Sequence, residues 1–199
     1  MIVVGGGIAG ASLAGSLGPD LRVLLLEGED FPGYHTTGRS AAFYSETYGG
    51  PRVQPLTTAS LPFFLDPPEA FGAPLVKAPR GALYVGRAEQ RGAVEAMHAL
   101  YPGLGLAIVG PEDIAARAPA LRPEWRAAAV WEPGVRDIQT SALHEGFLRQ
   151  LRRNGGTVLT GRRVTALARE GGLWRVHCGA EVHAAPTVVN AAGAWADEV

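Results

Sequence analysis

The sequence predicts an α/β fold in which a parallel sheet is interrupted by a second, β-containing segment. Short apolar runs at residues 2–4, 23–26 and 187–189 are typical of strands buried on both faces of a parallel sheet. A stretch of small residues at 8–17 predicts the helix that connects the first two strands. Strand-like and short helical runs alternate between residues 71 and 135, and this change of pattern predicts the interrupting segment.

Three glycines follow the first predicted strand. Gly5, Gly7 and Gly10 match the pattern G-x-G-x-x-G, and the acid Glu27 stands at the carboxyl end of the next strand. The first glycine allows a tight turn, the second allows backbone to approach a pyrophosphate, and the third allows close packing of helix on strand. Glu27 is suited to accept hydrogen bonds from an adenosine ribose. The sequence therefore predicts a Rossmann-like dinucleotide site, and these residues alone fit NAD and FAD equally.

The segment after Glu27 begins with irregular chain. We expect no regular element at 34–45, and then a helix from residue 51 that ends before Pro67, with Phe63 and Phe64 in the core.

The interrupting segment is expected to hold two strands and two short helices. The patterns predict strands at 81–86 and 127–131 and helices at 89–100 and 111–118, the first of these helices with Val94, Met97 and Leu100 facing inward.

The last third of the chain has clear helix and turn signals. Thr140 or Ser141 is expected to cap a helix with an apolar stripe of Leu143, Phe147 and Leu151, which ends at Asn154. A strand at 157–159, a hairpin of 163–168 with 173–178, and a return to the main sheet near residue 188 follow.

The composition limits the possible partners. The formal net charge is −1 and the basic residues are dispersed, which argues against nucleic-acid binding and favours small molecules. The single cysteine, Cys178, is expected to be a buried thiol in a reducing compartment, and the histidines lack ligand spacing, so no metal is expected. We find no basic leader and no apolar run of membrane-spanning length, and we expect a cytoplasmic protein with no transmembrane segment.

Two further segments resemble the D-amino acid oxidase/dehydrogenase superfamily of FAD-dependent enzymes. They are residues 33–42, GYHTTGRSAA, and residues 189–195, VNAAGAW. The similarity is strongest to the D-arginine dehydrogenases, through Tyr44, residues 48–49, residues 56–68, and Asp137, Ile138 and Thr140. It implies an FAD-binding domain in two parts, residues 1–70 and 136–199, with residues 71–135 as part of an inserted substrate domain. It covers only about the first half of a family member, so we expect a truncated chain with little activity of its own.

The resemblance implies a set of FAD contacts. Besides the glycines, they are Ala9, Glu27, Gly28, Thr36, Thr37, Gly38, Arg39, Ser40, Ala41, Ala42 and Val164. His35 is expected to shape this loop rather than act as a base.

Three positions are implied in substrate binding. Tyr48 matches a tyrosine that closes over substrate, whereas Ala82 and Phe43 replace a glutamate and a histidine of the D-arginine dehydrogenases. Without that glutamate a guanidinium loses a charged hydrogen bond worth about 1.5–3 kcal/mol. The implied activity is therefore FAD-dependent oxidation of neutral or apolar D-amino acids to 2-oxo acids and ammonia, with an unknown electron acceptor.

Two alternatives remain open. The chain can belong to a related flavoenzyme that acts on a hydroxy acid, a secondary amine or glycerol phosphate, or it can be an inactive fragment with a partial FAD site.

Overall fold

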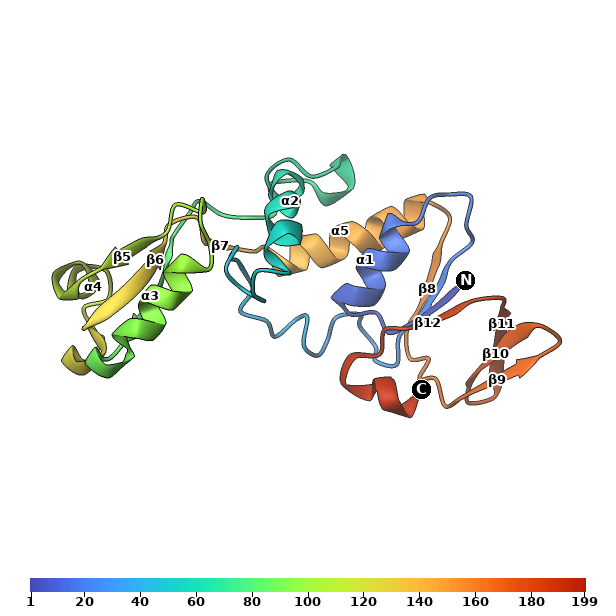
Figure 1. Cartoon of the computed structure of the whole chain (residues 1–199). Coiled ribbons are helices and arrows are strands. Elements are labelled where there is room, and N and C mark those ends of the chain that lie inside the picture. The colour runs from blue at the N-terminus through green and yellow to red at the C-terminus, as the bar shows by residue number, and fades with distance from the viewer. The chain divides into compact units, whose positions relative to one another are not determined.

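The computed structural model describes residues 1–199, whose helices and strands are labelled in Figure 1. Two compact units are present. The first consists of Met1–Ala41, Pro67–Leu75 and Gln139–Val199, and the second of Ala42–Asp66 and Val76–Ile138. Helix α2, Gln54–Leu65, belongs to the second unit, although the sequence suggested an FAD-binding domain up to residue 70. The roles of the two units as FAD-binding and substrate domains stay predictions.

The first unit is built on a parallel sheet. Its strand order is β12 (Val188–Asn190), β1 (Ile2–Val4), β2 (Leu24–Leu26) and β8 (Thr157–Leu159). Every neighbouring pair is parallel, and Val3 pairs with both Leu25 and Val189. The three apolar runs predicted as main-sheet strands are therefore confirmed, and the strand predicted at 157–159 joins the same sheet as β8.

Two helices cover one face of this sheet. They are α1 (Ile8–Ser16) and α5 (Thr140–Arg153), which lie side by side in Figure 1. The face carries Val3 and Leu25, both fully buried, against Ala11 and Ala14 of α1 and Leu151 of α5. Small residues on α1 let the helices approach closely: a Cβ on Gly15 would lie 2.5 Å from the carbonyl oxygen of Phe147.

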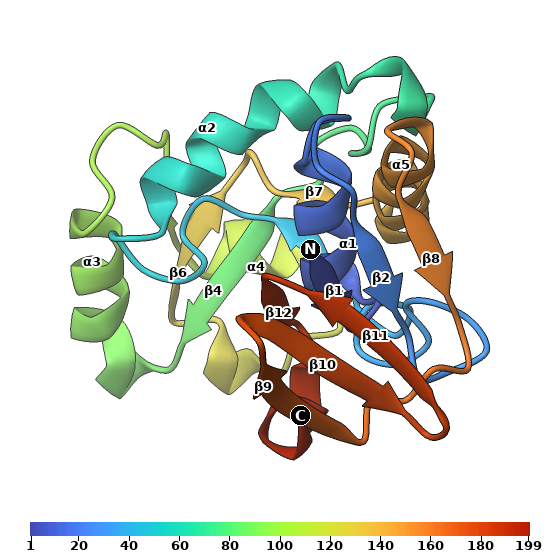
Figure 2. The ribbon, with the colours of Figure 1, turned by 90° about the vertical axis from the view of Figure 1, so that its right-hand side faces the viewer.

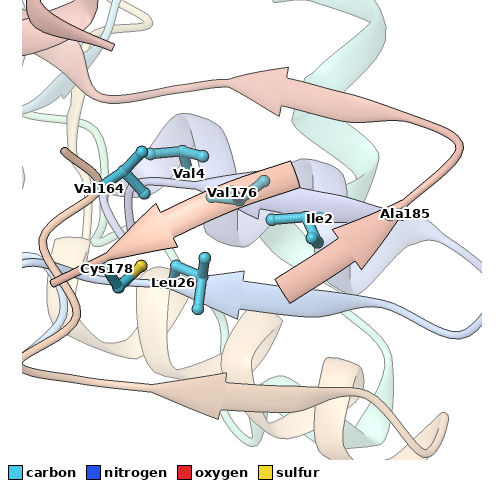
Figure 3. Packing of buried hydrophobic residues seen from close by; sticks show 7 residues of the cluster. All are labelled: Ile2, Val4, Leu26, Val164, Val176, Cys178 and Ala185. Carbon is cyan, nitrogen blue, oxygen red and sulfur yellow. The ribbon is translucent and has the colours of Figure 1, made fainter. Parts of the chain in front are cut away.

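An antiparallel sheet covers the other face. Its strands β9 (Ala166–Glu170), β10 (Leu173–Cys178) and β11 (Glu181–Ala185) lie in the order β11-β10-β9, as Figure 2 shows. Figure 3 shows Ile2, Val4 and Leu26 of the parallel sheet packed against Val176 and Cys178. Alternate residues of β1 thus serve two cores, which is the period of two expected of a strand.

The predicted hairpin is confirmed, but two expectations in this unit need correction. Strand β11 was not predicted, because its one large apolar residue, Val182, is 50 % exposed and its neighbours are polar. Thr140 and Ser141 are not the cap of α5. The N-cap is Gln139, whose side chain makes no capping bond; its N–H donates instead to the Leu75 carbonyl at 2.7 Å, so backbone pairing sets the helix start.

The second unit has a three-stranded antiparallel sheet. Its order is β4 (Ala82–Gly86), β6 (Ala128–Glu132) and β5 (Ala107–Val109), with α3 (Arg91–Ala99) packed on it through Val94. The other helical pieces of the chain are α4 (Pro111–Arg117), η1 (Glu69–Phe71), η2 (Ala88–Gln90), η3 (Pro123–Trp125) and η4 (Gly193–Glu198). A pair of two-residue strands, β3 (Phe43–Tyr44) and β7 (Arg136–Asp137), completes the unit.

Several expectations for this unit were wrong. Phe63 and Phe64 are only half-buried, since the apolar residues of α2 are spread around the helix and none is buried. Leu100 is 56 % exposed because it lies just beyond the last turn of α3. Strands β3 and β5 were not predicted, because short runs reveal themselves as strands only when a distant partner pairs with them.

None of the helices is both long and apolar enough to span a bilayer.

The close approach of α1 and α5 generates a stability prediction. Gly15→Ala places a methyl group against the backbone of Phe147, which cannot rotate away, and should destabilise the fold by about 1–3 kcal/mol. Gly92→Ala is the control, because a Cβ there meets nothing within 4 Å. The higher helix propensity of alanine should raise the free energy of unfolding of this variant by up to about 1 kcal/mol. Urea unfolding followed by circular dichroism measures both, and equal stability of the two variants would contradict the packing described.

Cys178 is buried, as predicted, and generates a second prediction. Burial raises the pKa of its thiol, and the nearby Glu181 carboxylate acts in the same direction. Because the thiolate is the reactive form, iodoacetamide at pH 8 should modify the folded chain at least about tenfold more slowly than the urea-unfolded chain. Mass spectrometry of quenched samples gives both rates; equal rates would show that the thiol is accessible.

Candidate dinucleotide site

A cleft opens at the carboxyl ends of β1 and β2, beside the start of α1. It has a volume of about 300 Å³. Its walls come from four stretches of the first unit, within residues 4–9, 26–37, 162–164 and 191–199. Open α/β sheets bind ligands at this edge, outside the carboxyl ends of their strands.

The glycine loop forms the floor of the cleft. Gly5 has a φ of +103°, which favours glycine, and a Cβ there would strike the carbonyl group of Ala191. Gly10 lies directly over Gly5, since a Cβ on Gly10 would strike the Gly5 carbonyl oxygen. Gly7 differs from both, because a Cβ there would meet only the Thr37 hydroxyl, at 3.4 Å. Two glycines thus allow the fold to close, and Gly7 leaves its side of the cleft open.

Glu27 lies beside the glycine loop, as the sequence predicted. Its Oε2 accepts a hydrogen bond from the Gly6 N–H at 2.8 Å, and its Oε1 accepts one from the Glu29 N–H at 2.9 Å. A carboxylate has about four acceptor positions. Glu27 therefore keeps acceptor capacity on the side that lines the cleft.

The loop after Gly33 closes over the start of α1. The Gly38 N–H donates to the Gly33 carbonyl at 2.7 Å, and Gly33 has a φ of +78°. Thr37, buried in this loop, accepts a hydrogen bond from the Ile8 N–H at 2.9 Å. The Ile8 N–H at the start of α1 is thus already bound by Thr37 and is not free for a phosphate, while Gly7 and Ala9 line the cleft beside it.

A cluster not predicted from the sequence lines the opposite wall. His35 Nε2 lies 3.0 Å from Glu29 Oε1, and Arg163 lies 3.3 Å from the same oxygen. The His35 hydrogen bond is the largest effect and lowers the pKa of Glu29; burial opposes it, and the charges of His35 and Arg163 lower the pKa by smaller amounts. The His35 ring also packs on Trp195, with 4.5 Å between centroids. This position agrees with a structural role for His35.

The family model for DAO, the FAD-dependent oxidoreductases, matches the chain over residues 1–199. The chain belongs to this family. The cofactor of the family is FAD.

Solved structures share the fold. Glycine oxidase from Geobacillus kaustophilus superposes with a TM-score of 0.84 at 19 % identity, over 99 % of this chain and 56 % of its own. L-α-glycerophosphate oxidase from Mycoplasma pneumoniae, with FAD bound, superposes with a TM-score of 0.81 at 17 % identity, over 98 % of this chain and 54 % of its own. L-proline dehydrogenase from P. horikoshii superposes with a TM-score of 0.79 at 21 % identity, over 98 % of this chain and 53 % of its own. The chain therefore spans about half the length of these proteins.

The cleft residues fit FAD. Gly5 and Gly7 offer backbone to a pyrophosphate, and Glu27 offers carboxylate oxygens to a ribose. Arg163 and Val164 border the same space, with the Val164 side chain directed into the core of Figure 3 and its backbone at the cleft.

The structure brings together most but not all of the predicted FAD residues. Eight line the cleft: Gly5, Gly7, Ala9, Glu27, Gly28, Thr36, Thr37 and Val164. Gly10 lies beneath it, whereas Gly38, Arg39, Ser40, Ala41 and Ala42 lie outside its lining. The Arg39 guanidinium packs over the Tyr34 ring, 4.9 Å from its centroid. Contact with FAD stays a prediction for all of the residues named, whether or not they line the cleft.

Glu29, Arg162, Arg163 and Trp195 are among the lining residues to which the sequence analysis gave no role. A signal for the arginines was present, because they follow a strand whose carboxyl end lies at the same sheet edge as Glu27. Trp195 stands in the segment that carries the family resemblance.

The predicted substrate residues lie in the second unit. Phe43 and Tyr48 line one small hollow there. Ala82 does not line that hollow; it lies half-buried on β4, in register with Glu132 of β6.

The open side of Gly7 generates a binding prediction. Gly7→Ala should weaken FAD binding at least about tenfold, because the methyl group takes the space that a pyrophosphate needs. The fold should stay within about 0.5 kcal/mol of the wild type, since the new Cβ makes one ordinary contact. Flavin fluorescence titration and urea unfolding measure the two effects. Gly18→Ala, where a Cβ meets nothing within 4 Å, is the control, and an unchanged FAD affinity in Gly7→Ala would argue against this cleft as the site.

Proposed function

We propose that the whole protein is an FAD-dependent oxidoreductase that converts D-amino acids with neutral or apolar side chains to 2-oxo acids and ammonia. The family and the cleft support the flavin chemistry. The resemblance of residues 33–68 to the D-arginine dehydrogenases supports the D-amino acid class. The choice of a substrate with a neutral side chain rests on an uncharged hollow in the second unit.

The hollow has a volume of about 260 Å³ and no charged lining residue. Its apolar walls are Phe43, Tyr48, Leu56, Phe64 and Ile138, and its hydroxyl groups belong to Tyr44, Ser45, Thr57 and Ser60. Such a lining suits an apolar side chain, because burying a cation without a partner is costly.

Tyr44 gives the hollow one specific polar group. Tyr44 is 3 % exposed and its hydroxyl oxygen is buried. Burial, followed by the charges of Glu46 and Glu132, raises the pKa of Tyr44 to about 12. The hydroxyl is therefore neutral at pH 7 and adds no charge to the wall of the hollow.

The carboxylate nearest to Ala82 in the sheet is already bound. Glu132 is 3 % exposed and accepts hydrogen bonds from the hydroxyls of Ser45, Thr47 and Tyr84 and from the Glu46 N–H, at 3.0, 2.6, 3.0 and 2.7 Å. Three of these donors meet on Oε2, which has no acceptor position left, and one binds Oε1. Glu132 is therefore a poor replacement for the glutamate that the D-arginine dehydrogenases carry at the position of Ala82.

The proposed reaction is the oxidation of an amine to an imine, followed by hydrolysis of the imine. FAD, when bound, would supply a hydride acceptor for the α-hydrogen of the substrate and pass the two electrons to an external electron acceptor. The substrate nitrogen would release a proton to solvent as the Cα–N single bond becomes a double bond, and water would then hydrolyse this imine to the 2-oxo acid and ammonia. Phe43 and Tyr48 would pack on the substrate side chain and exclude water from it.

We expect the full-length enzyme to prefer neutral or apolar D-amino acids. Turnover should be compared under one artificial electron acceptor for D-alanine, D-leucine, D-phenylalanine and D-arginine, with proline, glycine, 2-hydroxy acids and glycerol phosphate as further substrates. The kcat/KM for D-leucine or D-phenylalanine should exceed that for D-arginine by at least about tenfold, the value of one charged hydrogen bond. A D-arginine optimum would implicate Glu46 or Glu132 as the missing acid, and turnover of only a hydroxy acid, secondary amine or glycerol phosphate would favour the related flavoenzyme.

A substitution tests the role of Ala82. If this position faces the substrate, Ala82→Glu should raise the ratio of kcat/KM for D-arginine to that for D-leucine about tenfold or more. Ala107→Glu, on an exposed position of β5 in the same sheet, is the matched control and should leave the ratio unchanged. Equal ratios in the two variants would remove Ala82 from the substrate site.

A further inference from the structure

His144 is a buried histidine beneath the cofactor cleft that the sequence analysis did not connect with any site. It lies on α5, is 6 % exposed, and its Nε2 is 2.7 Å from the carbonyl oxygen of Gly6. A carbonyl oxygen only accepts hydrogen bonds, so Nε2 carries the proton and donates it. The residue therefore reaches from α5 to Gly6, which stands between the first two glycines of the G-x-G-x-x-G pattern.

The same ring packs against the second loop of the cleft. A Cβ on Gly33 would lie 2.9 Å from Cε1 and 3.1 Å from Nδ1 of His144, so only glycine fits against the ring without displacement. Gly33 begins the loop whose Thr37 caps the Ile8 N–H. One side chain thus contacts both loops that border the start of α1.

The Gly6–Gly7 peptide shows what this contact does. The chain has no cis peptide bond, and in a trans peptide the C=O and the following N–H point in opposite directions. When His144 holds the Gly6 carbonyl, the Gly7 N–H is turned to the other side of the loop, and Gly7 lines the cleft. The preceding N–H of Gly6 is bound by Glu27 at 2.8 Å, so the glycine is held at both ends.

We infer that His144 is a positioning residue of the FAD site, which orients the Gly7 N–H toward a pyrophosphate by holding the Gly6 carbonyl. The inference rests on the cofactor and is independent of the proposed substrate. Without His144, the loop would have to order this peptide when the ligand binds, and ordering a group on binding lowers affinity. The loss should affect ligands that contain a pyrophosphate and spare ligands that lack one.

The test compares three ligands of the purified chain. Calorimetric titrations with FAD, ADP and adenosine should be made on the wild type, His144→Leu and His144→Gln, whose amide can replace Nε2–H. We expect His144→Leu to weaken FAD and ADP about five- to twelvefold, which corresponds to one hydrogen bond, with adenosine within about twofold. His144→Gln should recover most of the loss.

A control variant and a replacement variant accompany these titrations. His98→Leu removes another helical histidine whose Nε2 faces a backbone carbonyl, that of Leu106 at 3.3 Å, and should change none of the three affinities. If circular dichroism shows that His144→Leu does not fold, His144→Asn, whose amide is too short to reach Gly6, replaces it. Equal losses for ADP and adenosine, or no loss for ADP, would overturn the inference, as would a wild-type chain that binds no FAD.

Discussion

Strand β1 is hydrogen-bonded along both edges, and the cofactor cleft depends on this double pairing. Val3 lies in register with Leu25 on one side and with Val189 on the other. The three-residue strand β1 thus connects the N-terminal and C-terminal parts of the chain within one sheet. The pairing continues past the strand, where the Gly5 N–H donates to Leu26 and the Ala191 N–H donates to Val4, both at 2.8 Å. The glycine turn, Glu27 and the segment after Asn190 therefore meet at one sheet edge.

Close backbone approach is the second constraint on the site, and it follows from the first. Because Ala191 is tied to Val4, its carbonyl leaves no space for a side chain on Gly5. Glu27 and His144 then hold the two ends of Gly6 through buried or half-buried polar contacts. A loop that is fixed before its ligand arrives loses little conformational freedom on binding. The site is thus preorganised by the packing of α5 and β2 around it.

The second unit satisfies a buried charge in a different way. Glu132 has no cationic partner within hydrogen-bond distance, and four neutral donors stabilise its carboxylate. The same bonds tie the chain at 45–47 to β4 and β6, and the Tyr101 hydroxyl adds a bond to the Thr47 carbonyl at 2.9 Å. Phe43 and Tyr48 flank this segment in the sequence, and both line the hollow.

The sequence by itself determined the β1–α1–β2 unit, its glycine turn and the place of Glu27, because these features depend on contacts between residues fewer than 30 positions apart. Strands β8 and β12 were predictable from their adjacent apolar residues, Val158 and Leu159 in one and Val188 and Val189 in the other, although each strand also holds one polar residue. Only the tertiary structure decided the contacts of His144, Arg163 and Glu132. Each of these side chains meets partners that lie more than 80 positions away in the chain, and nothing in the local pattern around a histidine or an acid records such a partner. Long-range pairing also decided strand β3, which pairs with β7, and the start of α5, where a backbone bond to Leu75, and not a side-chain cap, fixes the first turn.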